Sequence, residues 1–175
     1  DLSGPEGAAR ALEGLSPRAL VHAAGLLRTG IIGALDPANG AAMWRLHVEA
    51  SERLANLLAP RLPEGGRIVL IGSRTATGSA GRSQYAATKA AMVGMARSWA
   101  AELAPRGITV NVVAPAATET PMLRDPARAG VSPRVPPIGR FIRPEEVAAL
   151  TAFLLSDAAG AITGQQIVIC GGSSL

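Results

Sequence analysis

Arg67-Ile68-Val69-Leu70-Ile71 and Ile108-Thr109-Val110-Asn111-Val112-Val113 are two apolar, β-branched runs that flank an alanine-rich segment at 84–103. Such runs are typical of buried parallel strands, and the segment between them has the length and composition of a helix. Similar runs at 19–23 and 165–170 predict two more strands, and we expect further helices at 3–13, 36–60 and 144–156. Because strands alternate with helices, we predict an α/β fold with a doubly wound parallel sheet covered by helices on both faces.

The 175 residues contain no repeat, low-complexity tract or linker, so we expect a single domain over 1–175. The stretch 115–143 has no periodicity and carries prolines at 115, 121, 126, 133, 136 and 137. A loop of this length inside a compact domain is usually functional. We therefore interpret it as a substrate loop or lid.

Composition excludes several classes of protein. Hydrophobic residues make up 48% and charged residues 17%, which argues against disorder, and the apolar runs are too short to span a membrane. The 17 basic residues are one lysine and sixteen dispersed arginines, with few aromatic residues, so nucleic acid is not an expected partner. The chain opens without a signal-peptide pattern, and its one cysteine, Cys170, indicates a reducing compartment, so we expect a cytoplasmic protein.

The single tyrosine and the single lysine of the chain lie four residues apart, in Tyr85-Ala86-Ala87-Thr88-Lys89. At this spacing both side chains lie on one helix face. An ammonium near a phenol favours the phenolate, so the pair is a candidate general acid/base at a carbonyl or an alcohol. The alternative is a surface tyrosine that packs on the lysine stem.

The loops that follow residues 23, 71 and 113 hold unusual sequences. Parallel α/β sheets bind ligands at the carboxyl ends of their strands. The segments placed there are His22-Ala23-Ala24-Gly25, Gly72-Ser73 and Ala114-Pro115. These segments are therefore candidate parts of a binding site.

The order and spacing of the motifs along the chain resemble those of the short-chain dehydrogenase/reductase family. Residues 67–121 look most like the 3-oxoacyl-carrier-protein reductase type of that family. The resemblance rests on Tyr85-x-x-x-Lys89, on Ser73, on Ala23-Ala24-Gly25, on Asn111-Val112-Val113-Ala114-Pro115 with Thr120, and on the closing segments Phe153-Leu154, Ile162-Thr163-Gly164 and Gly171-Gly172. It implies a Rossmann-like fold of which this chain is the C-terminal portion, strands four to seven.

The resemblance also implies an activity: NAD- or NADP-dependent interconversion of a small-molecule carbonyl and a secondary alcohol, with no metal. Tyr85 would exchange the proton, Lys89 would lower the tyrosine pKa and bind the nicotinamide ribose, and Ser73 would hold the substrate oxygen. The positions that match the family's cofactor contacts are Asp1, Leu2, Ala23, Ala24, Gly25, Tyr85, Lys89, Pro115, Ala116, Thr118 and Thr120. As alternatives, Ser73 and Thr120 are turn or helix caps.

The chain departs from the family pattern at several positions. His47 stands where the resemblance places an active-site asparagine, and we hypothesise that it relays protons in its place. The alternative is a buried histidine satisfied by a backbone carbonyl. His22-Ala23 replaces two asparagines, Ala116 a glycine and Cys170 an aspartate, and the spacing of twelve residues from Ser73 to Tyr85 is tight for the family.

No Gly-x-x-x-Gly-x-Gly turn occurs in the chain, and the resemblance places that turn before Asp1. Because the sequence does not begin with Met, we expect that this segment is omitted or cleaved, which would leave the strand at 19–23 with an unpaired edge. A non-catalytic fragment that acts as an oligomerisation or interaction module is therefore the alternative function. A serine hydrolase is disfavoured because no Gly-x-Ser-x-Gly is present.

The resemblance implies a homodimer or homotetramer built on the helices 36–60 and 84–103. The small residues of 84–103, with Gly94 at its middle, are consistent with close helix contacts. Arginines at 124, 128, 134 and 140 lie in the expected substrate loop. They face either an acidic substrate or solvent.

Overall fold

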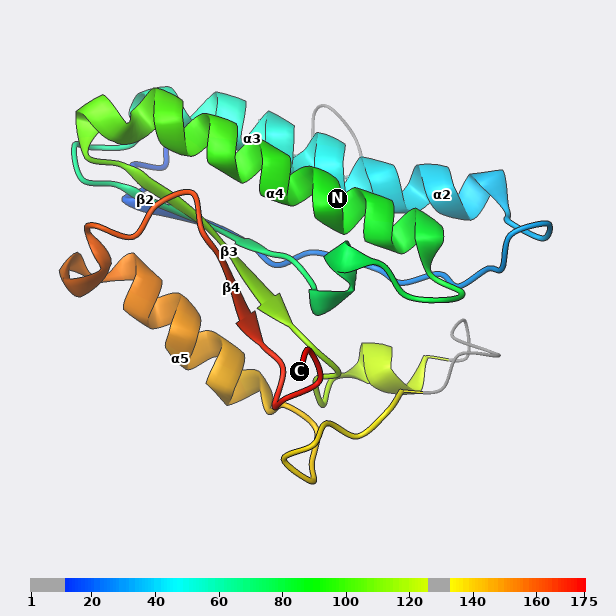
Figure 1. Cartoon of the computed structure of the whole chain (residues 1–175). Helices are drawn as coiled ribbons and strands as arrows, with labels where there is room; N and C mark the ends of the chain where they lie inside the picture. The colour runs from blue at the N-terminus through cyan, green and yellow to red at the C-terminus, as the bar shows by residue number, and fades with distance from the viewer. Residues whose placement is uncertain (1–11, 126–132) are drawn as a thin grey trace.

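The computed structural model describes residues 12–125 and 133–175, and Figure 1 shows three layers, with one parallel sheet between two layers of helices. The expected helix at 3–13 lies almost wholly outside the described residues. The predicted α/β fold with a parallel sheet covered on both faces is confirmed.

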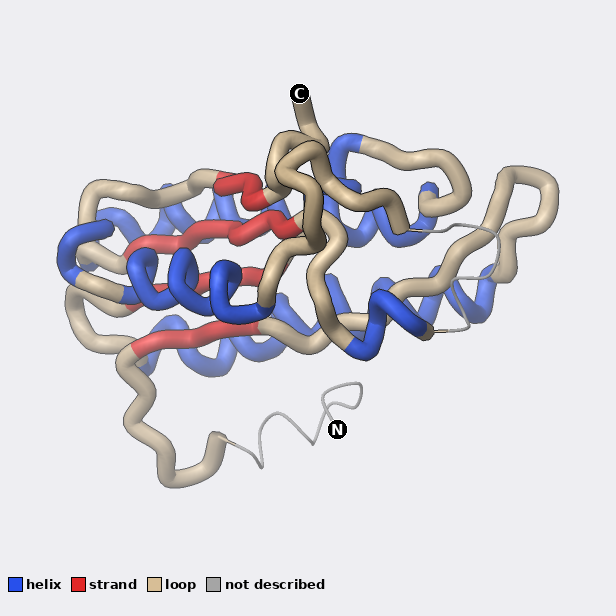
Figure 2. Tube along the Cα trace, turned by 90° about the horizontal axis from the view of Figure 1, so that it is seen from below, coloured by secondary structure: helices blue, strands red, loops and turns tan. Residues whose placement is uncertain are grey.

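The sheet has four parallel strands in the order β1-β2-β3-β4, which is also their order in the sequence. The strands are β1 (Ala19–His22), β2 (Arg67–Ile71), β3 (Thr109–Pro115) and β4 (Gln166–Ile169). β3 runs two residues further than the apolar run suggests, because Ala114 and Pro115 pair with Val168 and Ile169 of β4. Figure 2 shows β1 and β4 at the edges and the long loops gathered at one end of the strands.

Alternating side chains build two cores, one on each face of the sheet. On one face Ile68 and Leu70 of β2 lie in a cluster with Leu54 and Met92 from the helices above. On the other face Val69 lies with Leu154 of the helix below. This two-residue alternation is the pleat of the strand, and it explains why β2 is apolar throughout.

The predicted helix at 36–60 is a helical stretch of four parts rather than one regular helix. Its parts are α2 (Pro37–Trp44), the π-helical turn η1 (Arg45–Glu49), α3 (Ala50–Leu58) and the 3-10 turn η2 (Ala59–Arg61). Asp36 caps α2, because its carboxylate accepts from the Ala38 amide at 2.8 Å. The apolar pattern does not show the π turn. Within the turn, His22 donates to Leu46 O, and Ser51 donates to His47 O.

The predicted helices at 84–103 and 144–156 are α4 (Ser83–Leu103) and α5 (Pro144–Leu155). α4 lies beside α2 and α3, whereas α5 covers the opposite face (Figure 1). The remaining short turns are the 3-10 helices η3 (Arg74–Thr77), η4 (Ala104–Arg106), η5 (Pro121–Arg124) and η7 (Asp157–Ala159).

The described parts of the stretch 115–143, which was expected to lack structure, contain more structure than the prolines suggest. η5 lies within it, and Thr118 forms a parallel bridge with Ile142. Residues 126–132 fall outside the described residues. None of the described helices is long and apolar enough to cross a membrane.

Candidate active site

A large cavity of about 1420 Å³ opens at the carboxyl ends of the strands. Its walls come from the loops after β1, β2 and β3, from the first turns of α4, and from η5 and α5. The cavity therefore occupies the position at which parallel α/β sheets bind ligands. Ser73, Tyr85 and Lys89 all line it.

Tyr85 and Lys89 are presented by the first two turns of α4. Both are buried, with 7% and 4% of their surface exposed, and the Lys89 Nζ lies 5.8 Å from the centroid of the tyrosine ring. Lys89 Nζ also donates to Ile71 O, the last carbonyl of β2, at 2.9 Å. Burial excludes the alternative of a surface tyrosine on a lysine stem, because both side chains face the interior.

Burial lowers the pKa of Lys89 from 10.5 to about 7. An ammonium loses hydration when it is buried, so its charged form becomes less stable. Among the described residues no carboxylate forms an ion pair with it. Lys89 can therefore take up or release a proton close to neutral pH.

Ser73 follows β2 and begins the turn η3. Its Oγ accepts from the Thr75 amide at 3.1 Å, so the capping role considered above is present. Capping uses an oxygen lone pair, which leaves the hydroxyl proton to be donated. The preceding Gly72 is required by space, because a Cβ there would lie 2.5 Å from Val112 Cγ1. Gly72 thus lets the backbone that carries Ser73 run close to β3.

His47 lies fully buried in the π turn, and both of its ring nitrogens are engaged. Nε2 accepts from the Leu26 amide at 3.1 Å, so the proton resides on Nδ1, which donates to Thr88 Oγ1 at 2.8 Å. The imidazole also contacts the Tyr85 ring edge-on, with centroids 5.6 Å apart at 86°. Its partners are thus an amide and a hydroxyl, not the backbone carbonyl considered in the alternative.

The environment keeps His47 neutral. Burial, followed by the charges of Lys89 and His22, lowers the pKa of His47 to about 3. A relay would need a proton donor other than a backbone amide at Nε2. The proton relay through His47 stays a prediction, and the contacts favour a positioning role between α4 and the loop after β1.

Most of the expected cofactor positions lie together on the cavity wall. The lining includes Ala23, Gly25, Pro115, Ala116, Thr118 and Thr120. Ala24 lies in the same loop but does not line the cavity, and Asp1 and Leu2 lie outside the described residues. Because most of these side chains are absent or small, this wall fills little of the cavity.

Gly25 indicates how closely this wall approaches the interior. A Cβ at Gly25 would lie 3.2 Å from His47 Nε2 and 3.8 Å from Lys89 Nζ. The loop therefore passes directly over the two basic side chains. The Lys89 ammonium donates hydrogen bonds to Ile71 O and, at 3.6 Å, to the Met92 sulfur, which leaves its third N–H for a ligand. These residues fit a ribose and ring of the nicotinamide type.

Three residues in or near the cavity carry no motif and were missed from the sequence. Arg74 and Arg82 line the cavity, and Thr88, beside it, links the backbone carbonyl of Tyr85 to His47. The sequence position of Arg74 could have suggested a place in the site, since it directly follows Ser73 at the carboxyl end of a strand. Of the substrate-loop arginines, Arg134 lines the cavity, whereas Arg140 pairs with Glu146. Arg128 lies outside the described residues.

Comparison with known proteins gives the family and the fold. The family model described as enoyl-(acyl carrier protein) reductase matches residues 13–174. A 3-oxoacyl-[acyl-carrier-protein] reductase of Thermotoga maritima is 38% identical over 159 residues, which cover 87% of this chain and 64% of that protein. The reductase of the same name from Salmonella typhimurium is 50% identical over 111 residues, or 61% of this chain and 45% of that protein. The chain thus spans between 45% and 64% of the length of these relatives.

Solved structures show the same fold. A blue fluorescent protein from a metagenomic library, in complex with NADPH, has a TM-score of 0.89 and 30% identity, and the match covers all of this chain and 74% of that one. A short-chain dehydrogenase from Burkholderia cenocepacia in complex with NADP has a TM-score of 0.86 and 33% identity, with 100% and 75% covered. The chain belongs to the short-chain dehydrogenase/reductase family.

Proposed function

We propose that the protein is an NAD(P)-dependent oxidoreductase that interconverts a carbonyl and a secondary alcohol. The observation that carries the proposal is the convergence of Ser73, Tyr85 and Lys89, from two different elements, on one cavity at the carboxyl ends of the strands. The NADPH and NADP complexes of structural neighbours support the cofactor class.

Each residue has a role that follows from its chemistry. Ser73, whose lone pair is used in capping, donates its hydroxyl proton to the substrate oxygen. Tyr85 gives a proton to that oxygen in reduction and takes it back in oxidation. Lys89 places a positive charge near the phenol ring and restores the tyrosine proton, because its own pKa lies near 7. A bound nicotinamide would supply or accept the hydride.

The cofactor would be held by the small residues on the opposite wall. Ala23, Gly25, Pro115 and Ala116 leave space for the ring and ribose, and Thr118 and Thr120 offer hydroxyl groups at its edge. His47 fixes the loop that carries Gly25 against α4, through the Leu26 amide and Thr88. A serine hydrolase stays disfavoured, because neither His22 nor His47 hydrogen-bonds Ser73.

We also propose that the helical stretch 36–60, which includes α2 and α3, and helix α4 form a homodimer or homotetramer interface. A groove of about 610 Å³ runs along α3 and α4, and Glu52, Trp99 and Leu103 contribute to it. Trp44, on α2 beside it, is exposed to 44%. Sedimentation of the full-length protein at micromolar concentration tests this assembly, and a monomer there would contradict it.

The catalytic proposal is tested by fluorescence titration of the full-length protein with NADPH, followed by turnover on a panel of ketones and aldehydes. We expect saturable micromolar binding and NADPH oxidation that depends on the carbonyl. Tyr85→Phe, which keeps the ring and removes the proton, should retain binding and lose turnover at least a hundred-fold. Cofactor binding with equal turnover by Tyr85→Phe would refute the assigned role.

A further inference from the structure

The charged side chains that line the cavity all have the same sign. They are Arg74, Arg82, Lys89 and Arg134, and no described lining residue is an aspartate or a glutamate. A concave, partly apolar wall with charges of one sign concentrates ligands of the opposite sign. The cavity is therefore suited to an anion in addition to a carbonyl group.

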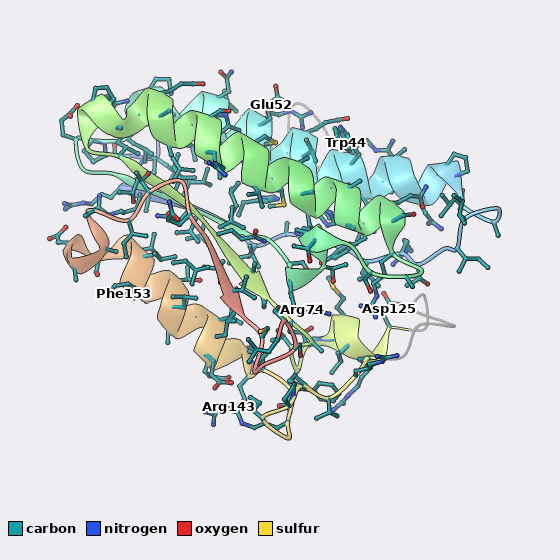
Figure 3. The ribbon with its side chains drawn as sticks, viewed as in Figure 1. Trp44, Glu52, Arg74, Asp125, Arg143 and Phe153 are labelled. Carbon is teal, nitrogen blue, oxygen red and sulfur yellow. The ribbon has the colours of Figure 1, made fainter. Side chains whose placement is uncertain are left out.

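Arg74 differs from the other arginines in its surroundings. It is half-buried in η3, yet its guanidinium makes no ion pair or hydrogen bond to another described residue. By contrast, Arg28 pairs with Asp125 at 3.4 Å and Arg140 with Glu146 at 2.7 Å. Figure 3 labels Arg74 in the region between η3 and η5, at the open end of the strands. Its planar fork of donors is therefore available to a ligand.

We propose that Arg74 determines substrate specificity by binding a carboxylate or phosphate group of the carbonyl substrate. A guanidinium binds both anions through two parallel hydrogen bonds. Ser73 and Arg74 are consecutive, so their Cα atoms are about 3.8 Å apart. A substrate that binds both side chains would carry its carbonyl and its anionic group on the same short molecule, as a keto acid does. This inference rests on the proposed oxidoreductase function.

The position of Arg74 favours the substrate over the cofactor as its ligand. The expected cofactor positions lie in the loops after β1 and β3, whereas Arg74 lies after β2, beside the residue assigned to the substrate oxygen. Arg134 and Val135, from the second half of the substrate loop, also line the cavity. The cavity thus combines Arg74 with a second cation and with apolar wall, which suits an anion on a short carbon chain.

The test compares acetoacetate with its methyl ester, which has the same reacting carbonyl and no charge. For the full-length protein with NADPH, Arg74→Gln should lower the ratio of kcat/KM for acetoacetate to that for the ester. The expected fall is about ten- to a hundred-fold, which is the range of one lost charge-assisted hydrogen-bonded pair. It should appear mainly in KM for acetoacetate. Arg74→Lys keeps the charge without the planar pair of donors, and its acid-to-ester ratio of kcat/KM should lie between those of the wild type and Arg74→Gln.

Arg124→Gln is the matched control. Arg124 is an exposed arginine of η5 outside the cavity lining, and its loss changes the net charge by the same amount. The acid-to-ester ratio should not change in this variant. An unchanged ratio in Arg74→Gln, or an equal fall in Arg124→Gln, would overturn the proposal.

Two further measurements separate the alternatives. Titration with NADPH should give the same Kd for the wild type and Arg74→Gln; a Kd raised ten-fold with an unchanged ratio would assign Arg74 to the cofactor phosphates and overturn the proposal. If neither substrate is turned over, the oxidoreductase function fails for these compounds, and calorimetric binding of acetoacetate decides about Arg74. Binding at least ten-fold tighter to the wild type supports its role, and equal binding contradicts it.

Discussion

Replacing Lys89 with methionine should stabilise the protein while it abolishes activity. The buried ammonium lies on the apolar side of α4, where its pKa falls from 10.5 to about 7. At about 1.4 kcal/mol per pH unit, this fall corresponds to about 5 kcal/mol of destabilisation when the lysine is charged in both the folded and the unfolded state. The hydrogen bond to Ile71 O, which methionine cannot make, contributes about 2 kcal/mol in the opposite direction.

The net effect depends on pH in a defined way. Below pH 7 Lys89→Met should be more stable by about 3 kcal/mol. Between pH 7 and 10.5 the unfolded wild type binds one more proton than the folded wild type, so wild-type stability rises with pH. The advantage of Lys89→Met should therefore shrink by about 1.4 kcal/mol per pH unit and vanish near pH 9.

Urea denaturation of both proteins at pH 6, 7.5 and 9 measures this difference directly. Arg97→Met, at an exposed position of the same helix, is the control, and it should change the free energy of unfolding by less than about 0.5 kcal/mol at every pH. A difference between Lys89→Met and wild type that is independent of pH would refute the reasoning. So would a less stable Lys89→Met at pH 6.

Three further predictions concern His47, two glycines and Glu146. His47→Ala should lose about 2–4 kcal/mol of stability, because the Leu26 amide loses its acceptor and a cavity opens, but the pH profile of turnover should keep its shape; a shifted acid limb would favour the relay instead. Gly94→Ala should stabilise the monomer by about 1 kcal/mol, since a Cβ there meets open space within the single chain, whereas Gly72→Ala should destabilise by about 1–3 kcal/mol through its clash with Val112; equal unfolding midpoints for the two would contradict the assigned packing. Arg140, the Arg143 amide and Arg143 lower the pKa of Glu146 to about 2, so the small stabilisation that Glu146→Gln removes should be present above pH 4.5 and disappear as the pH falls towards 2, which urea midpoints across that range would detect or exclude.

The sheet could be predicted closely from the sequence because its signal is local. A buried parallel strand must be apolar on both faces, and the runs at 67–71 and 108–113 differ from the observed strands by at most two residues at an end. The π turn at Arg45–Glu49 was not predicted, since the apolar spacing of 36–60 fits a regular helix; its hydrogen bond from His22 to Leu46 O joins residues that are distant in sequence. The order within 115–143 likewise depends on the non-local bridge from Thr118 to Ile142.

The candidate site also contains residues that local sequence predicts and residues whose roles depend on distant contacts. Tyr85 and Lys89 could be placed together from their spacing alone, and Ser73 from its position after a strand, and all three line one cavity. The arrangement around His47 could not be predicted from the sequence, because the neutral state of its imidazole follows from burial, and its orientation from contacts to Leu26 and Thr88. Arg74 was passed over because a lone arginine carries no motif, and only the cavity shows that its guanidinium is available.

The most direct test of the central claim follows the hydrogen that is transferred. The full-length protein is supplied with NADPH carrying deuterium at C4 of the dihydronicotinamide, together with a ketone that it reduces, and the alcohol is analysed by mass spectrometry. We predict one deuterium on the carbinol carbon, and no labelled alcohol from Tyr85→Phe under the same conditions. An alcohol without deuterium when either face of C4 is labelled, or a cofactor that binds and is never consumed with any carbonyl compound, would contradict the account.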